Sequence, residues 1–346
     1  MQYSAYSVVF SILAFTGCLA CIPPLVVHIR AGNTAAIILT VGVIIMCSFN
    51  ALNALLWPTA ASDTWWNGKI LCDIEAKLYF GQAVSFNGVL LCLFRHIASI
   101  LDTDRMSLGA SRRQRMVTIT VEIGLCIVLP CIVMAAHCLV SPQRYWIRTI
   151  AGCTPSLDNS WPSLVLIYMW PMALCLAACI YCVRAMVRLW RHRKEMSTVL
   201  SSTPGVTRSQ HIRLISFSAV LLLIYLPLDV IAFAGFMRTK WHLYSWAYNH
   251  PADWSDIVVF VPQKTVSFDR WSQTFAAYIL FGFYGTGHEA TRIYSFWIHS
   301  LKQGLRRGDG WKPNTMGTVG ISHSVPPEAS DSHVSTETFQ LTELGQ

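Results

Sequence analysis

The sequence predicts an all-α membrane protein built as a bundle of seven transmembrane helices. Of its 346 residues, 53% are hydrophobic and only 13% are charged, and the mean hydropathy is +0.44. A soluble protein carries about 25% charged residues, so lipid is the expected solvent for most of this chain. Seven apolar runs are long enough to cross about 30 Å of hydrocarbon. They lie at residues 5–29, 35–57, 74–98, 116–139, 162–186, 212–236 and 272–298.

The first run is expected to be a retained membrane helix. No basic residue precedes it, and it continues to about Ile29, which is too long for the core of a signal peptide. The Lys and Arg residues between the runs then predict the direction of the chain. With the N-terminus outside, 16 of the 26 Lys and Arg residues lie on the inner side and seven on the outer side. Positive charge accumulates on the cytoplasmic side, so we expect the N-terminus outside and the C-terminus in the cytoplasm.

The chain is expected to divide into a membrane core, residues 1–299, and a cytoplasmic tail, residues 300–346. The tail is basic to about residue 312. From Pro313 onward it contains no Lys or Arg and is rich in Ser, Thr, Pro and acids, a composition that is typical of disorder. Its Ser and Thr residues are candidate phosphorylation sites, and an unmodified disordered tail is the alternative.

Composition also limits the class of function. The net charge is +8, but the basic residues lie between apolar runs, so nucleic acid is not an expected partner. The chain has twelve cysteines, most of them within apolar runs, and it lacks the paired spacing of a metal site. We expect no metal, no cofactor and no catalytic residue, because no histidine cluster, acid pair or nucleophile–base spacing indicates a membrane enzyme. A seven-span transporter or channel is the alternative function, although only the third run shows a polar lining.

A series of motifs runs in order from about Pro23 to Trp297. They are "PPLVVHIRAGNTAAI", "FNALNALLW", "WWNGKILCDIEAKL", "RHIASIL", "SRRQRM", "QRYWIRTIAGC", "TRSQHIRLI", "YLPLD", "YSWAYNHPADW" and "FGFYGTGHEATRIY". In this order they resemble the fungal lipopeptide (a-factor-type) mating-pheromone receptors, which are class D G-protein-coupled receptors. The resemblance implies a multi-pass receptor of the plasma membrane. Such a receptor binds a farnesylated peptide pheromone and activates a heterotrimeric G protein in the mating response.

The third run begins with an unusual set of charges, Asp73, Glu75 and Lys77. Asp73 and Lys77 are four residues apart and share a helix face. Ionisable groups in a membrane are costly and often mark a functional site, so one interpretation is that the three contact the peptide ligand. The other is that they mark a wet boundary. Further along the same helix, a stripe of small and polar residues is expected to face the bundle. The stripe is Gly81, Ser85, Gly88, Cys92 and Arg95.

Cys72 and Cys153 would both lie outside the cell, where disulfides form. We expect them to pair, while Cys138 is a rival partner and two free thiols are a further alternative. Tryptophan is concentrated on the same side. The tryptophans at or beyond the outer boundary are Trp57, Trp65, Trp66, Trp146, Trp161, Trp241, Trp246, Trp254 and Trp271.

The third outer loop, residues 238–270, is too long for a simple turn. It is predicted to form an aromatic lid over an amphipathic ligand, or a folded loop that its own aromatic residues stabilise. The candidate ligand-binding residues are Asp73, Glu75, Lys77, Trp66, Gln82, Trp161, Tyr244, Trp246 and Trp254.

At the inner face, Arg95 occupies a position where the resembled family has a basic residue. It is a candidate G-protein contact or half of an ionic latch with Glu289, and snorkelling to the interface is the plain alternative. Glu289 has Arg292 as a second possible partner.

Arg184, Arg188 and Arg191 share one helix face in the long third inner loop, as candidate G-protein contacts or simply as retained positive charge. Pro227 is expected to kink the sixth helix, with Asp229 two residues beyond it. That helix is therefore the predicted switch between two packings of the bundle.

Overall fold

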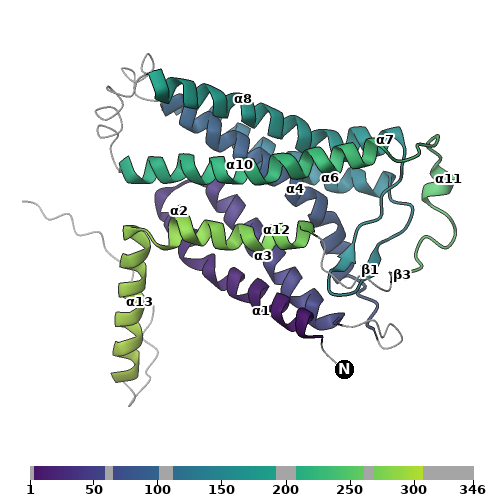
Figure 1. Ribbon diagram of the computed structural model, residues 1–346, viewed down its shortest axis with the longest axis horizontal. Helices are drawn as coiled ribbons and strands as arrows, with labels where there is room; N and C mark the ends of the chain where they lie inside the picture. Colours follow the sequence, from purple (N-terminus) through teal and green to yellow (C-terminus); the bar gives the residue numbers. More distant parts are fainter. Residues whose placement is uncertain (1–3, 59–64, 101–111, 192–207, 261–267, 307–346) are drawn as a thin grey trace, which may run out of the picture. The chain divides into compact units, whose positions relative to one another are not determined.

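The computed structural model describes residues 4–58, 65–100, 112–191, 208–260 and 268–306 (Figure 1). The chain divides into two units, Met1–Trp297 and Ile298–Gln346. The first unit contains the bundle, and the second contributes the end of one helix to the described residues. The predicted disordered tail from residue 313 lies outside the described residues.

Most of the first unit is helical. The α-helices are α1 Ala5–Ala20, α2 Ile22–Ala31, α3 Thr34–Leu56, α4 Leu71–Ile100, α5 Arg112–Ile123, α6 Leu129–Ala136, α7 Trp161–Ser163, α8 Met169–Arg191, α10 Arg208–Met237, α11 Trp246–Asn249, α12 Phe268–Leu280 and α13 His288–Arg306. In the described part of the chain, three π-helical turns and one 3₁₀ turn continue them, namely η3 Gly124–Val128, η5 Leu164–Tyr168, η6 Phe281–Gly285 and η4 His137–Leu139.

Six helical segments among the described residues are long and apolar enough to cross a membrane. They are Ala5–Ala31, Thr34–Leu56, Leu71–Ser99, Arg112–Leu139, Trp161–Trp190 and Arg213–Met237, and each end lies within four residues of the first six predicted runs. Their outward faces carry exposed large apolar side chains such as Ile12, Ile132 and Val183. An apolar outer surface of this kind is stable when hydrocarbon covers it.

The uninterrupted apolar run predicts one continuous helix for the first span, but the structure shows a break in it. α1 ends at Ala20, Cys21 forms a turn, and α2 begins at Ile22. Pro23 and Pro24 explain the interruption, because proline has no backbone N–H and is tolerated only in the first turn of a helix. The apolar run alone did not indicate this break.

The prediction of a continuous helix over residues 272–298 is wrong. α12 begins earlier, at Phe268, and continues through η6 to Gly285. The chain then leaves the helical conformation at Thr286 and Gly287 before α13 begins at His288. Glycine is a poor helix former because it has the most backbone freedom to lose, and two glycines flank Thr286. The segment Phe268–Gly285 is not among the six candidate spans, since its first turns carry charged and polar residues.

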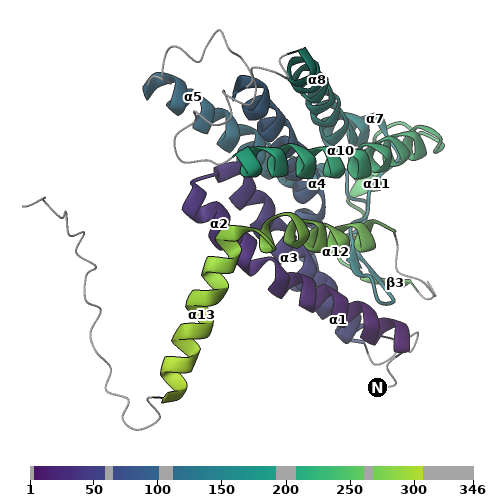
Figure 2. The same cartoon turned by 60° about the vertical axis from the view of Figure 1, so that its left-hand side comes forward.

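α4 is the central helix of the bundle, and 67% of its most apolar stretch is buried. It packs against α3, α6, α8 and α10, and Figure 2 shows it behind α10. Its stripe of small residues faces the fourth span. The Ser85 hydroxyl donates to the carbonyl of Cys126, at 2.8 Å, and a Cβ at Gly88 would lie 2.7 Å from the carbonyl oxygen of Leu125. The small side chains therefore let the two backbones come close together.

α1, α3 and α12 form a second group of neighbouring helices (Figures 1 and 2). The Tyr278 hydroxyl of α12 donates to the carbonyl of Leu13 in α1, at 2.8 Å. The Asn50 amide of α3 donates to the side-chain oxygen of Gln273 in α12, at 3.3 Å. Polar side chains in an apolar bundle need such partners, so these contacts fix α12 against its two neighbours.

A small sheet was not predicted by the sequence. β1 Trp146–Arg148 pairs antiparallel with β2 Gly152–Thr154 and parallel with β3 Val258–Phe260. We call β1, β2 and the turn between them the hairpin, and the end of the bundle that carries it the hairpin end. β3 comes from the loop that precedes α12, so the sheet joins two loops far apart in the sequence.

Candidate functional site

The hairpin is covalently joined to the start of α4. Cys72 and Cys153 form a disulfide and both are fully buried. This is the pairing that the sequence favours, whereas Cys138 is an exposed free thiol. Gly152, beside the disulfide, has φ +67 and lies against the side chain of Asn53. Only glycine adopts this conformation without strain and leaves room for Asn53, so the hairpin can lie directly on α3.

The tip of the hairpin enters the bundle. Ile150 is buried with Phe10 of α1, Ala54 of α3 and Trp271 of α12, and its backbone N–H donates to the carbonyl of Trp57 at 2.8 Å. Its φ of 64 is uncommon for a β-branched residue. The surrounding contacts hold it in that conformation, and together they close the space between α1, α3 and α12.

A buried ion pair lies beneath the hairpin. Arg270 of α12 and Glu75 of α4 are 2% and 0% exposed, and the Arg270 Nη1 to Glu75 Oε1 distance is 2.7 Å. Arg270 also donates to the carbonyl of Cys153 at 2.5 Å and to the Asn50 side chain at 3.2 Å. A buried charge is stable only when such partners replace water. Arg270 therefore ties α12 to α3, α4 and the hairpin.

Two further side chains extend this cluster. The Asn53 amide donates to Glu75 Oε1 at 2.8 Å and to the carbonyl of Ala151 at 3.1 Å. The Tyr79 hydroxyl donates to Asp269 at 2.9 Å, and the Tyr79 ring lies 5.5 Å from the Arg270 guanidinium. We call Asn50, Asn53, Glu75 and Arg270 the polar cluster. It holds the hairpin onto three helices.

Asp73 makes a second, more accessible ion pair. Both of its carboxylate oxygens accept from Arg144, at 2.7 Å from Nε and 2.5 Å from Nη2, and the two side chains are about a quarter exposed. The hydrogen bond that Arg144 donates to Asp73 raises the pKa of its guanidinium. From their spacing, Asp73 was expected to share a helix face with Lys77. In the structure Asp73 forms its ion pair with Arg144, and the Lys77 side chain is exposed.

The long loop after α10 is folded onto the hairpin end. The Asp158 carboxylate lies 2.7 Å from His242 Nε2 and accepts from the Asn249 amide at 3.2 Å. The Trp254 indole donates to the carbonyl of Ser141 and the Tyr244 hydroxyl to that of Leu139, both at 2.9 Å. The part of this loop that the structure describes is therefore held by specific polar contacts.

The remaining ligand candidates have different surroundings. Trp66, Trp161 and Trp246 are exposed; Trp66 stacks on Trp57, and Trp246 stacks on His250 at 3.8 Å between ring centroids. Gln82 lies deeper, against Gly42 of α3. No group of three His, Cys, Asp or Glu side chains within the described ranges is placed to hold a metal ion.

At the opposite end, two helices are joined through Arg188. Its Nη1 donates to the carbonyl of Ala98, in the last turn of α4, at 2.7 Å, and Arg184 lies over the ring of Tyr181. Arg95 has an electrostatic neighbour that the sequence analysis did not identify, Glu122 of α5. The side chains of Arg191 and Glu289 lie outside what the structure describes, so the Arg95–Glu289 latch stays a prediction.

α10 is helical through Pro227. Asp229, two residues further on, interacts with Asn87 of α4 and Cys175 of α8. Proline cannot complete the helical hydrogen bond to residue 223, and the neighbouring acid joins α10 to two other helices. The break in the ladder and the polar contact therefore lie on the same stretch of α10.

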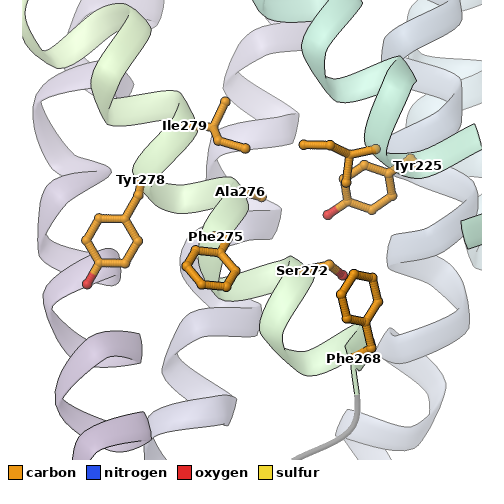
Figure 3. Close-up of a pocket in the computed structure, with 8 residues that line it drawn as sticks. Tyr225, Phe268, Ser272, Phe275, Ala276, Tyr278 and Ile279 are labelled. Atoms are coloured by element: carbon orange, nitrogen blue, oxygen red, sulfur yellow. The ribbon is translucent and has the colours of Figure 1, made fainter.

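A cavity of about 510 Å³ opens between α10 and α12 (Figure 3). α10 contributes Ile224 and Tyr225 to its lining, and α12 contributes Phe268, Ser272, Phe275 and Ala276 among others. The volume is typical of a small-molecule site, about 300–1,000 Å³. Three lining residues carry hydroxyls: Tyr225 contacts Ser272, and the Tyr278 hydroxyl donates to Leu13 of α1. The free surface of this cavity is apolar.

Four residues of the site were not predicted from the sequence: Arg270, Asn50, Asn53 and Arg144. Arg270 was counted as a loop charge because the apolar run begins only at residue 272. A signal was present for the two asparagines, since they lie three residues apart in an otherwise apolar helix. Residues at that spacing share a helix face, and amides inside a membrane need polar partners.

Comparison with known proteins adds independent information. The sequence profile of the pheromone A receptor family matches residues 9–302. The pheromone a factor receptor of Saccharomyces cerevisiae is 26% identical over 292 residues, which cover 84% of this chain and 61% of that protein. The pheromone B alpha 3 receptor of Schizophyllum commune is 24% identical over 300 residues, or 83% of this chain and 46% of that protein. The pheromone M-factor receptor of Schizosaccharomyces pombe is 21% identical over 314 residues, or 90% and 82%. The chain thus spans less than two thirds of the first two relatives.

Proposed function

The chain belongs to the pheromone A receptor family, and from this membership we propose that it is a G-protein-coupled receptor for a farnesylated peptide mating pheromone. The observation that carries the proposal is the match of the family profile over residues 9–302, which covers the bundle from Val9 of α1 onward. The candidate membrane spans and their apolar outer faces support a multi-pass protein at the cell surface. The family match favours this function over that of a seven-span transporter or channel, and the family is not a class of enzymes.

We propose seven crossings, with the segment Phe268–Gly285 as the seventh, the N-terminus outside and the C-terminus in the cytoplasm. The hairpin end is then extracellular, and its disulfide lies in an oxidising compartment. The excess of Lys and Arg in the alternate segments gives the same direction. In this topology residues 1–299 form the receptor core and residues 300–346 form the cytoplasmic tail.

For ligand contacts, the accessible candidates at the hairpin end are the exposed Lys77, Trp66, Trp161 and Trp246 and the partly exposed Asp73. Glu75 takes another role in the proposal, because its carboxylate is fully buried and positions Arg270. The proposal gives Gln82, Tyr244 and Trp254 a structural role, in which they position neighbouring segments and do not contact the ligand.

The test of this function is nucleotide exchange on a purified heterotrimeric G protein. Receptor in lipid nanodiscs is mixed with a panel of synthetic farnesylated peptides, and each peptide is also made without its lipid. At least one farnesylated peptide is expected to accelerate exchange tenfold or more, while its unlipidated form requires a much higher concentration. Transport or turnover of a solute without any exchange would contradict the proposal.

We propose that α10 is the moving element, with Arg95, Arg184, Arg188, Arg191 and Glu289 at the G-protein face. Replacing Pro227 with Ala restores the helical hydrogen bond, so the balance between the two packings is expected to shift. A coupling energy of about 1–3 kcal/mol corresponds to a change of about fivefold or more in apparent affinity. Dose–response curves for exchange measure this shift in Pro227→Ala and Pro227→Leu. Unchanged ligand affinity and signalling in both variants would exclude Pro227 from the switch.

A further inference from the structure

Among the residues that the structure describes, the hairpin covers the centre of the bundle between α3, α4 and α12. Its tip is buried at Ile150, and the carbonyls of Ala151 and Cys153 are bonded to the polar cluster. Glu75 and Arg270 are buried and paired. A ligand at this end therefore meets a closed surface there.

The flank between α10 and α12 is different. α12 packs closely on α3 and α1 and more sparsely on α10, and the 510 Å³ cavity lies in that gap. Figure 3 shows Ala276 and Ser272 of α12 facing Tyr225 of α10 across it. The lining from Phe268 to Ile279 extends along α12 for about 16 Å, at 1.5 Å per residue. We call this apolar cavity the slot, and its α12 wall begins close to the hairpin end.

We propose that this cavity binds the isoprenoid chain of the lipidated ligand, an inference that rests on the proposed function. The lining suits a hydrocarbon chain, since its polar hydroxyls already have partners: Tyr225 contacts Ser272, and the Ser272 hydroxyl donates to the carbonyl of Asp269 at 2.7 Å. The position of the cavity also suits the isoprenoid chain. Its lining begins at Phe268, two residues before Arg270, and Arg270 bonds the hairpin to α12. A peptide lying on the hairpin end therefore needs little length to deliver its lipid into the slot.

A chain bound in this cavity would contact both α10, the proposed moving helix, and α12. Ile224 and Tyr225 precede Pro227 on α10, and the opposite wall belongs to α12, which holds the polar cluster through Arg270. A chain inserted here separates or tilts α10 relative to α12. The acyl chains of the bilayer are present with or without ligand, so they cannot report its arrival. In this proposal the signal comes from the isoprenoid chain, which enters the cavity only together with the ligand.

The experiment uses the full receptor in nanodiscs and a farnesylcysteine methyl ester with a photoreactive diazirine at the end of the isoprenoid chain. Label is expected in peptides from α10 and α12, and excess unlabelled farnesylcysteine methyl ester is expected to reduce it at least fivefold. Ile224→Trp fills the cavity and is expected to lower the labelling about tenfold. Ile279→Trp fills it from α12 and provides a second variant if the first does not fold.

The matched control is Leu223→Trp, which makes a similar change at the adjacent residue. Leu223 is 74% exposed and does not line the cavity, so its labelling is expected to stay within twofold of the unmodified receptor. Label outside α10 and α12, unchanged labelling in both filled variants, or equal competition by oleate would each overturn the inference. If a farnesylated peptide still drives nucleotide exchange in that case, the proposed function stands and only the lipid site is wrong.

Discussion

Replacing Arg270 with Met is expected to destabilise the receptor by about 3–5 kcal/mol, the cost of leaving one partner of a buried ion pair uncompensated. Glu75 keeps the Asn53 amide as a donor but loses its counter-charge. The carbonyl of Cys153 and the Asn50 side chain lose a donor at the same time. Thermal unfolding in detergent, followed with a thiol-reactive dye that detects buried cysteines as they become exposed, is expected to shift down by roughly 10 °C.

The control for this prediction is Asp73→Asn, which removes a charge from the other ion pair. Asp73 and Arg144 are partly exposed, and such pairs contribute only about 0.2–1 kcal/mol. The double variant Glu75→Gln/Arg270→Met is expected to be more stable than Arg270→Met alone, because it leaves no unpaired charge. Equal shifts of the unfolding temperature in Arg270→Met and Asp73→Asn would show that Arg270 does not stabilise the hairpin end more than the exposed ion pair does.

The bundle could be predicted from the sequence because long apolar runs are a strong and local signal. The six candidate spans agree closely with their runs, and the central position of α4 follows from its stripe of small residues. The seventh run differs from the structure at its start and in its interior, for two reasons. α12 begins with the polar residues around Arg270, which hydropathy alone assigns to a loop, and the glycines at 285 and 287 end the helix inside the run.

The candidate site was predicted less well because its contacts are distant in the sequence. Glu75 and Arg270 are separated by 195 residues, and no local pattern indicates that they meet. The strands β1, β2 and β3 have three residues each, too few to show a period of two. Among the contacts of the hairpin end, the disulfide was the one anticipated from the sequence, since topology and compartment limited the choice of cysteines.

Removing the disulfide is the second change with a large expected effect. Cys72 and Cys153 are separated by 81 residues, and a bridge of that span restricts the unfolded chain by up to about 4.5 kcal/mol, with 2–4 kcal/mol typical. Cys72→Ser and the double variant Cys72→Ser/Cys153→Ser are therefore expected to lose similar stability, because the first substitution already opens the bridge. Intrinsic tryptophan fluorescence follows their unfolding without interference from new thiols. The control is Cys138→Ser, a free and exposed cysteine that is expected to change stability by less than about 0.5 kcal/mol.

The disulfide and the polar cluster hold the same hairpin, so their effects are expected to be coupled. Arg270 donates to the carbonyl of Cys153 itself, and this bond requires the hairpin to stay on the bundle. Once the bridge is absent the hairpin is held less firmly, and Arg270→Met then removes a contact that is already weakened. Interaction energies between residues that share partners are about 0.5–3 kcal/mol, so Arg270→Met is expected to cost less in the Cys72→Ser/Cys153→Ser background than in the unmodified receptor. Strictly additive losses would show that the hairpin is held at two independent points rather than as one cooperative unit.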